Sequence, residues 1–179
     1  MIQNLVDIDP GKDFPKIARM IVEIPKGSTH KYEYDKELGI FRLDRALYSP
    51  IHYPGDYGFI PGTLAEDGDP LDILVWADQP TFCGCLMEVR PIAMLKMVDQ
   101  KEPDTKIFAV PERDPRYDQV KDVDDVFPHV RREIEHFFTV YKDLEGKKTE
   151  ISGWLKAKAA LAEAAEARER YQEKKKSGR

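Results

Sequence analysis

Short runs of apolar residues, several of them alternating with polar ones, lie before residue 124 and predict a strand-rich structure. The runs that fit strands are residues 17–24, 31–35, 40–43, 71–76, 85–98 and 106–110. Residues 36–39 separate two of these runs, end in Gly39 and predict a hairpin turn. Because successive strand side chains point to opposite faces, we expect Lys31 and Glu33 on one face. Residues 50–62 are rich in proline and glycine, and no strand is assigned there.

Apolar residues at helical spacing begin only near Pro128, which suits the first turn of a helix. Gly146 is a plausible stop for this helix. The residues that recur at helical spacing are Val130, Ile134, Phe137, Phe138 and Tyr141. Residues 154–176 are rich in Ala, Glu and Lys, and they predict a second, more exposed helix that ends in a frayed basic tail.

Composition is that of an ordinary soluble protein, and we predict one domain over residues 1–179. The 28 Lys and Arg residues against 33 Asp and Glu give a net charge of −5, which argues against a nucleic-acid partner bound through a basic face. The N-terminus has no basic start and no apolar segment of a signal peptide, so we expect a cytoplasmic protein without a membrane partner. Two cysteines, Cys83 and Cys85, are too few for a structural zinc site.

An acidic loop directly precedes the predicted strand 71–76. Asp67, Asp69 and Asp72 place three carboxylates within six residues, and Pro70 stiffens the loop between them. Neighbouring carboxylates repel one another unless a counter-charge compensates them. Oxygen-only ligands suit a hard cation such as Mg²⁺ better than zinc. A solvated acidic turn explains these six residues equally well, because Asp and Gly favour turns.

A second acidic cluster, residues 99–106, contains Asp99 and Asp104 and closes one predicted strand. If strand pairing brings both clusters together, five carboxylates would surround a cavity able to hold several divalent ions. Two neighbouring metals activate water and clamp a phosphoryl group. The alternative is that each cluster is a separate polar turn.

Basic and phenolic side chains complete the candidate site. They lie at strand ends, in the glycine-rich segment or at the end of the first helix: Lys31, Arg45, Lys106, Lys142, Tyr53, Tyr57 and Tyr141. Taken singly, each fits a surface lysine or a packed tyrosine. Together with clustered carboxylates they indicate a polyanionic substrate that arrives with metal, and phosphate esters or anhydrides fit this best.

The chain resembles the soluble family I inorganic pyrophosphatases, in the short form typical of prokaryotes. The family signature Asp-x-Asp-Pro-x-Asp matches residues 67–72. Further matching segments follow in order over nearly the whole chain: 22–25, 31–33, 43–45, 53–58, 95–97, 99–106 and 136–145. The resemblance implies a mainly β (α+β) fold, a small five-stranded, mostly antiparallel OB-like barrel flanked by two principal helices. It also implies hydrolysis of pyrophosphate to two orthophosphates, several Mg²⁺ ions per active site and a homohexamer.

The resemblance also implies a role for each candidate residue. Asp69 matches the general base that orients the attacking water. The matches to metal ligands are Asp67, Asp72, Asp99 and Asp104. The matches to groups that hold the two phosphates are Lys31, Arg45, Tyr57, Lys106, Tyr141 and Lys142. Supporting positions are matched by Glu23, Glu33 and Tyr53.

Several alternatives remain beside this interpretation. An EF-hand is disfavoured because Asp72 occupies the loop position where that motif needs glycine. A different Mg-dependent phosphatase of the HAD type would place its acidic motif after a hydrophobic strand, whereas here the strand follows. The non-enzymatic alternative is an OB-like oligonucleotide-binding module, which would need stacking aromatics over a basic groove.

A possible subunit contact involves His136 and Asp143. These residues are seven apart, so on one continuous helix they would share a face that could meet its symmetry mate. A surface histidine without any such role is an equally good explanation of His136 alone.

Overall fold

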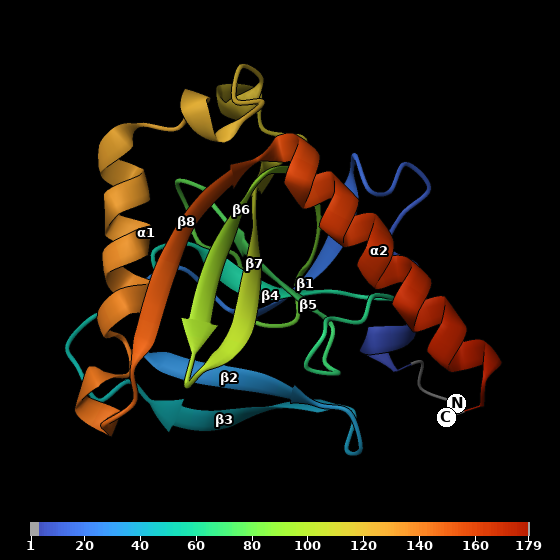
Figure 1. The fold of residues 1–179 in the computed structure, drawn as a ribbon, viewed down its shortest axis with the longest axis horizontal. Coiled ribbons are helices and arrows are strands. Elements are labelled where there is room, and N and C mark those ends of the chain that lie inside the picture. Colours follow the sequence, from blue (N-terminus) through green and yellow to red (C-terminus); the bar gives the residue numbers. More distant parts are fainter. Residues whose placement is uncertain (1–3, 179) are drawn as a thin grey trace.

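The computed structural model describes residues 4–178, and most of its elements are strands (Figure 1). The strands are β1 (Ala18–Ile24), β2 (His30–Asp35), β3 (Ile40–Ala46), β4 (Asp56–Ile60), β5 (Leu71–Val75), β6 (Leu86–Asp99), β7 (Glu102–Pro111) and β8 (Thr149–Lys156). Two long helices, α1 (Pro128–Val140) and α2 (Ala157–Lys176), accompany four short 3₁₀ helices, among them η4 (Asp143–Glu145). The expectations for the extreme N-terminus and the last tail residue fall partly on residues 1–3 and 179, outside the described range.

Five strands close into a small barrel. Their order is β1, β4, β5, β7 and β6, and β6 pairs again with β1 to complete the circuit. Only the β5–β7 pair is parallel, and the other neighbours are antiparallel. Strands β2 and β3 form a separate hairpin across the turn at residues 36–39. The structure therefore confirms the mainly β fold with a five-stranded, mostly antiparallel barrel and two principal helices.

Strand β6 is long enough to serve two partners along one edge. Its first residues pair with β1, and its residues from Ala93 to Asp99 pair with β8. The predicted helix over residues 154–176 was therefore wrong at its start, because residues up to Lys156 complete the free edge of β6. Trp154 in β8 packs edge-on against Phe108 at 5.2 Å between ring centroids. Helix α2 begins only at Ala157.

Two further boundaries differ from the sequence interpretation. Helix α1 ends at Val140, and Gly146, at φ +72°, instead ends the short helix η4. His136 and Asp143 thus lie on different elements, and the expectation of one shared helical face was wrong. The second acidic cluster is a hairpin rather than a loop: Gln100 and Lys101, both at positive φ, form its two-residue turn. Asp104 therefore belongs to β7.

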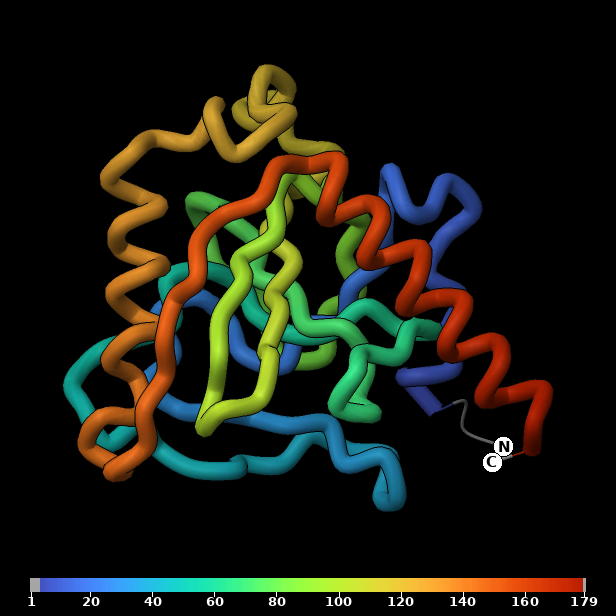
Figure 2. The backbone as a smooth tube through the Cα atoms, viewed as in Figure 1, coloured from blue at the N-terminus to red at the C-terminus, as the bar shows by residue number. Residues whose placement is uncertain are grey.

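The two helices cover different parts of the barrel (Figures 1 and 2). Helix α1 buries Ile134, Phe137 and Phe138 in one core cluster. Helix α2 buries three small residues of one face, Ala160, Ala164 and Ala167, in a second cluster. Neither helix is long and apolar enough to cross a membrane within residues 4–178. Residues of the β2–β3 hairpin and of the barrel together line the candidate site.

Candidate active site

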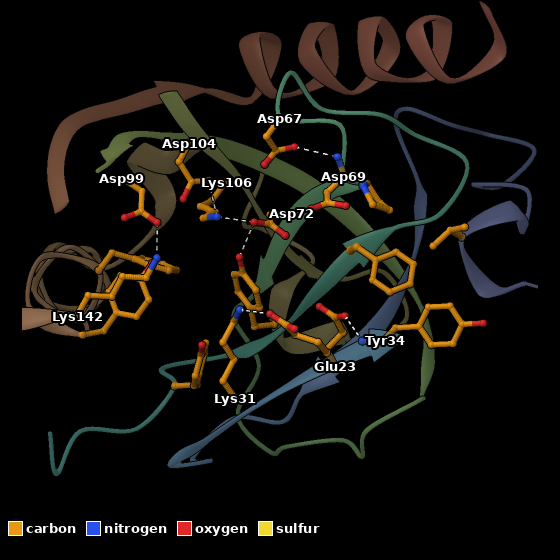
Figure 3. Close-up of a pocket in the computed structure, with 18 of the residues that line it drawn as sticks. Glu23, Lys31, Tyr34, Asp67, Asp69, Asp72, Asp99, Asp104, Lys106 and Lys142 are labelled. Atoms are coloured by element: carbon orange, nitrogen blue, oxygen red, sulfur yellow. Dashed lines mark hydrogen bonds and ion pairs between the residues drawn. The ribbon is translucent and has the colours of Figure 1, made fainter. Parts of the chain in front are cut away.

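A cavity of about 350 Å³ lies where β2, the β4–β5 loop, the tip of the β6–β7 hairpin and the end of α1 meet (Figure 3). The two acidic clusters share this cavity, which is the first of the two alternatives that the sequence left open. Strand register explains why: Ile73 of β5 pairs with Ile107 of parallel β7, which places Asp72 next to Lys106. The candidate residues that line the cavity are Glu23, Lys31, Glu33, Tyr53, Tyr57, Asp67, Asp69, Asp72, Asp99, Asp104, Lys106, Tyr141 and Lys142.

Lys106 lies at the centre of the carboxylates and is only 5% exposed. Its ammonium forms ion pairs with Asp72 and, at 2.5 Å, with Asp104. Burial alone would lower the pKa of Lys106, but these two carboxylates outweigh it and raise the pKa above its ordinary value. The Tyr57 hydroxyl donates to Asp72 at 2.6 Å, and its own pKa is raised by burial and by Asp72. Lys106 is therefore a fixed positive charge between Asp72 of β5 and Asp104 of β7.

Asp99 and Lys142 form another ion pair of the cavity. Lys142 directly follows Tyr141, whose ring is buried against Phe137 and Phe138 at the end of α1. Helix α1 thereby presents Lys142 to the hairpin tip. The Asp99 Oδ1 atom is buried and has no hydrogen-bond partner within residues 4–178. An acceptor of this kind is costly unless a donor or a cation satisfies it.

The acidic loop carries Asp67 and Asp69 on the connection from β4 to β5. The amide of Asp69 donates to Asp67 Oδ1 at 3.0 Å, and the amide of Ala65 donates to the Asp69 carbonyl at 2.7 Å. The Asp69 side chain is 69% exposed and pairs with Lys36 at 2.5 Å. Lys36 also lines the cavity, although it was not among the predicted site residues. No local signal marks Lys36, because it stands in a hairpin turn remote in sequence from Asp69.

Glu23 and Glu33 lie at the β2 side of the cavity. Lys31 and Glu33 share one face of β2, as predicted, and pair at 2.5 Å. Glu23 accepts the Tyr34 amide at 2.8 Å. Burial, reinforced by the charges of Asp72 and Glu33 and opposed by the Tyr34 amide and Lys31, raises the pKa of Glu23 to about 7. Near neutral pH this carboxyl is therefore poised between its two protonation states.

The raised pKa of Glu23 predicts a pH-dependent stability difference between wild type and Glu23→Gln. The folded state binds the Glu23 proton more tightly than the unfolded state does. In buffer without divalent cations, the free energy of unfolding of wild type should therefore fall as pH rises from the ordinary glutamate range to about 7. Glutamine stays neutral and can still accept the Tyr34 amide. The two proteins should melt together at low pH, and the variant should melt higher at about pH 8. Melting temperatures are measured by circular dichroism at each pH. A difference between the two proteins that stays constant across this range would contradict the raised pKa.

Arg45 is the one predicted substrate-binding residue that the described chain does not place on the cavity wall. Its guanidinium pairs with Asp44 at 2.5 Å and with Glu145 at 2.7 Å. The remaining Nη2 atom is buried without a partner in residues 4–178. Glu145, whose side chain is 6% exposed, orients Arg45 from the segment after α1, a contact that sequence analysis did not anticipate. Arg45 thus retains a free donor suited to an anionic oxygen.

The charge balance of the cavity fits divalent cations. Seven carboxylates line it against four lysines, so its walls carry an excess of negative charge when all groups are ionised. Burial, with the charges of Asp72 and Asp99, raises the pKa of Asp104 despite Lys106. No three carboxylate, histidine or cysteine side chains among the described residues are grouped to bind one ion, since lysines stand between them. The all-oxygen donor set and the unpaired Asp99 Oδ1 nevertheless match the ligands of a hard cation.

Known proteins resemble this chain over nearly its whole length. The family model described as inorganic pyrophosphatase matches residues 20–172. An inorganic pyrophosphatase of Geobacillus stearothermophilus is 52% identical over 160 residues, which cover 89% of this chain and 97% of the relative. One of Methanosarcina mazei is 51% identical over 161 residues, covering 90% and 95%. The crystal structure of inorganic pyrophosphatase from Thermus thermophilus superposes with a TM-score of 0.93 at 46% identity, covering 95% of this chain and 99% of that one.

Sequence, fold and cavity agree on one assignment. The chain belongs to the inorganic pyrophosphatase family.

Proposed function

We propose that this protein is an Mg-dependent inorganic diphosphatase that hydrolyses pyrophosphate to two orthophosphates. The observation that supports this most directly is the buried Lys106, paired with Asp72 and Asp104 in a cavity that also holds Asp67, Asp69 and Asp99. Such a cavity offers ligands for cations and positive charge for a polyanion together. Family membership and the matching motifs add independent support.

Four aspartates would hold the magnesium ions: Asp67, Asp72, Asp99 and Asp104. When bound, Mg²⁺ lowers the pKa of water toward neutrality and offsets phosphate charge. Asp67 lies in the β4–β5 loop, Asp72 in β5, and the other two aspartates in the β6–β7 hairpin, so the barrel fixes their relative positions. Three neighbouring side chains would support this set: Glu23 of β1, Glu33 of β2, and Tyr53, whose ring packs against Tyr57.

Asp69 is the proton acceptor in this proposal. The water oxygen forms a bond to one phosphorus, its proton passes to Asp69, and the bond from that phosphorus to the bridging oxygen breaks. Asp69 suits the role because its side chain projects from the loop tip and is 69% exposed. Its counter-ion Lys36 stands in the turn of the β2–β3 hairpin, and both side chains of the pair are solvent-exposed.

The phosphates would be held by lysine, arginine and tyrosine side chains. Lys31, Lys142 and Lys106 approach the cavity from three different elements. Tyr57, Tyr141 and Arg45 add donors at its floor and edge. Positive groups arranged before substrate arrives stabilise the charge that develops on the leaving phosphate.

We also propose a single domain over residues 1–179, a cytoplasmic location and a homohexameric assembly. The hexamer is supported only by the resemblance to short family members, since the helical face proposed for His136 and Asp143 does not exist. Sedimentation velocity at micromolar concentration tests it: a species six times the chain mass is expected, and a monomer contradicts it.

Substrate class is tested by measuring phosphate release from pyrophosphate and from an aryl phosphomonoester under identical conditions with Mg²⁺. We expect rapid release of two phosphates per pyrophosphate and little from the monoester. A comparable rate on the monoester would favour the alternative of a general Mg-dependent phosphatase. Salt-sensitive binding of a single-stranded oligonucleotide without pyrophosphatase activity would favour the OB-like binding module.

A further inference from the structure

Three hydrogen bonds join α2 to the segment that leads into the acidic loop. Arg168 Nη1 donates to the Gly62 carbonyl at 2.9 Å, and Arg170 Nε donates to the Leu64 carbonyl at 2.8 Å. Between them, the Leu64 amide donates to the Ala167 carbonyl at 2.9 Å. A short stretch just before Asp67 is therefore bound to a helix more than a hundred residues away in sequence (Figure 1).

Both arginines are themselves oriented. Arg170 Nη2 pairs with Glu163 on the same helix at 2.6 Å, and Arg168 Nη2 pairs with Asp9 at 3.1 Å. The Arg170 side chain is 29% exposed and that of Glu163 is 24% exposed, so this pair is largely shielded. A guanidinium fixed on one side by a carboxylate loses little freedom when it binds a carbonyl on the other. Arg170 is thus preorganised to hold Leu64.

The loop beyond Leu64 is closed by hydrogen bonds at its base. There, Thr63 Oγ1 accepts a hydrogen bond from the Leu71 amide at 3.0 Å and donates one to the Ile60 carbonyl at 2.5 Å. At the tip, Asp67 and Asp69 project into the cavity and are joined to the loop by local hydrogen bonds. The position of the tip is therefore set by the short segment that α2 holds.

We propose that Arg170, oriented by Glu163, is a positioning residue for Asp67 and Asp69. This rests on the proposed function, because it assigns Arg170 to the placement of a metal ligand and of the proton acceptor. Removal of groups that orient metal ligands commonly weakens metal affinity or activity by about 10- to 100-fold. Arg170 contacts neither substrate nor metal in this account and acts only through the Leu64 carbonyl.

The contribution of Arg170 can be separated from helix packing. Helix α2 is attached to the barrel by Ala160, Ala164 and Ala167, which are fully buried and do not involve the arginine side chain. Truncation of Arg170 removes the contacts to Leu64 and Glu163 and leaves this apolar face unchanged. Local loosening of the loop is expected, with the fold retained.

The test uses the full chain, stripped of divalent ions, as wild type, Arg170→Ala, Arg170→Lys and Glu163→Gln. Arg132→Ala, at an exposed position of α1, is the matched control. Three quantities are measured: Mg²⁺ affinity by titration calorimetry, amide hydrogen exchange of residues 65–69 by mass spectrometry, and kcat and KM for pyrophosphate. For Arg170→Ala we expect about tenfold weaker Mg²⁺ binding, faster exchange in this segment and a lower kcat. Arg170→Lys should recover part of each loss, because its ammonium can still donate to Leu64.

The outcomes separate this inference from the proposed function. If Arg170→Ala folds and binds Mg²⁺ as tightly as wild type, with the same amide exchange in residues 65–69, the positioning role is overturned. The proposed pyrophosphatase function is unaffected by that result, because it rests on the activity of the wild-type protein. If Arg170→Ala fails to fold, Glu163→Gln decides in its place: weaker Mg²⁺ binding with faster loop exchange supports the inference, and wild-type values overturn it. Equal losses in Arg132→Ala would also overturn it.

Discussion

Asp69→Asn is expected to lower kcat for pyrophosphate by about 10²- to 10⁴-fold, the range typical of general acid–base catalysis. The amide keeps the shape of the side chain but cannot take the proton of the attacking water. Because Asp69 is mostly exposed at the loop tip, its replacement should leave the melting temperature and the Mg²⁺ affinity nearly unchanged. Steady-state kinetics combined with titration calorimetry measures both quantities.

Asp72→Asn is the matched control for this result. Asp72 contacts Lys106 and Tyr57 and is proposed to bind metal, so its replacement should weaken Mg²⁺ binding directly. Turnover of Asp69→Asn equal to that of wild type at neutral pH would remove Asp69 from the role of proton acceptor. A loss of Mg²⁺ affinity in Asp69→Asn that matches the loss in Asp72→Asn would make Asp69 a ligand instead.

Lys106→Met is expected to destabilise the protein by about 3–5 kcal/mol in buffer without divalent cations, as removal of one partner from a buried ion pair typically does. The substitution keeps most of the aliphatic stem but leaves Asp72 and Asp104 without their shared counter-charge. The penalty should be smaller at acidic pH, where protonation of Asp104, whose pKa is raised, relieves the repulsion. Urea unfolding at two pH values measures it.

Divalent cations distinguish this charge effect from loss of packing. Mg²⁺ supplies positive charge to the same carboxylates and should restore part of the stability of Lys106→Met, while activity stays low. Lys106→Arg keeps the charge and should cost much less stability. If Mg²⁺ stabilises Lys106→Met no more than it stabilises wild type, the carboxylates that pair with Lys106 are not the ones that bind the metal.

Four of the five barrel strands could be predicted from sequence, because they are apolar runs bounded by turn residues. Strand β4 was missed, because Asp56–Ile60 lies within the proline- and glycine-rich residues 50–62. Strand β8 was also missed, since residues 149–156 combine Gly153 with exposed positions and resemble the start of the helix that follows. The strand exists because the end of β6 offers an unpaired edge, which is a property of the assembled sheet. The end of α1 was likewise misplaced, because Gly146 was the nearest local stop signal.

The two acidic clusters of the candidate site could be predicted from sequence. That they lie in one cavity could not be derived from the residues of either cluster. The parallel β5–β7 pairing brings Asp72 to Lys106, and no local pattern specifies that pairing. The family resemblance supplied it. Contacts of Lys36, Glu145 and Arg170 were missed because each joins side chains or carbonyls far apart in sequence.

The central claim, that this carboxylate cavity hydrolyses pyrophosphate with bound divalent cations, is tested most directly by phosphate release in one sample before chelation, after it and after restoration of Mg²⁺. The account predicts two orthophosphates per pyrophosphate with Mg²⁺, loss of activity after exhaustive chelation and full recovery when excess Mg²⁺ returns. Full activity that persists after exhaustive chelation would contradict it.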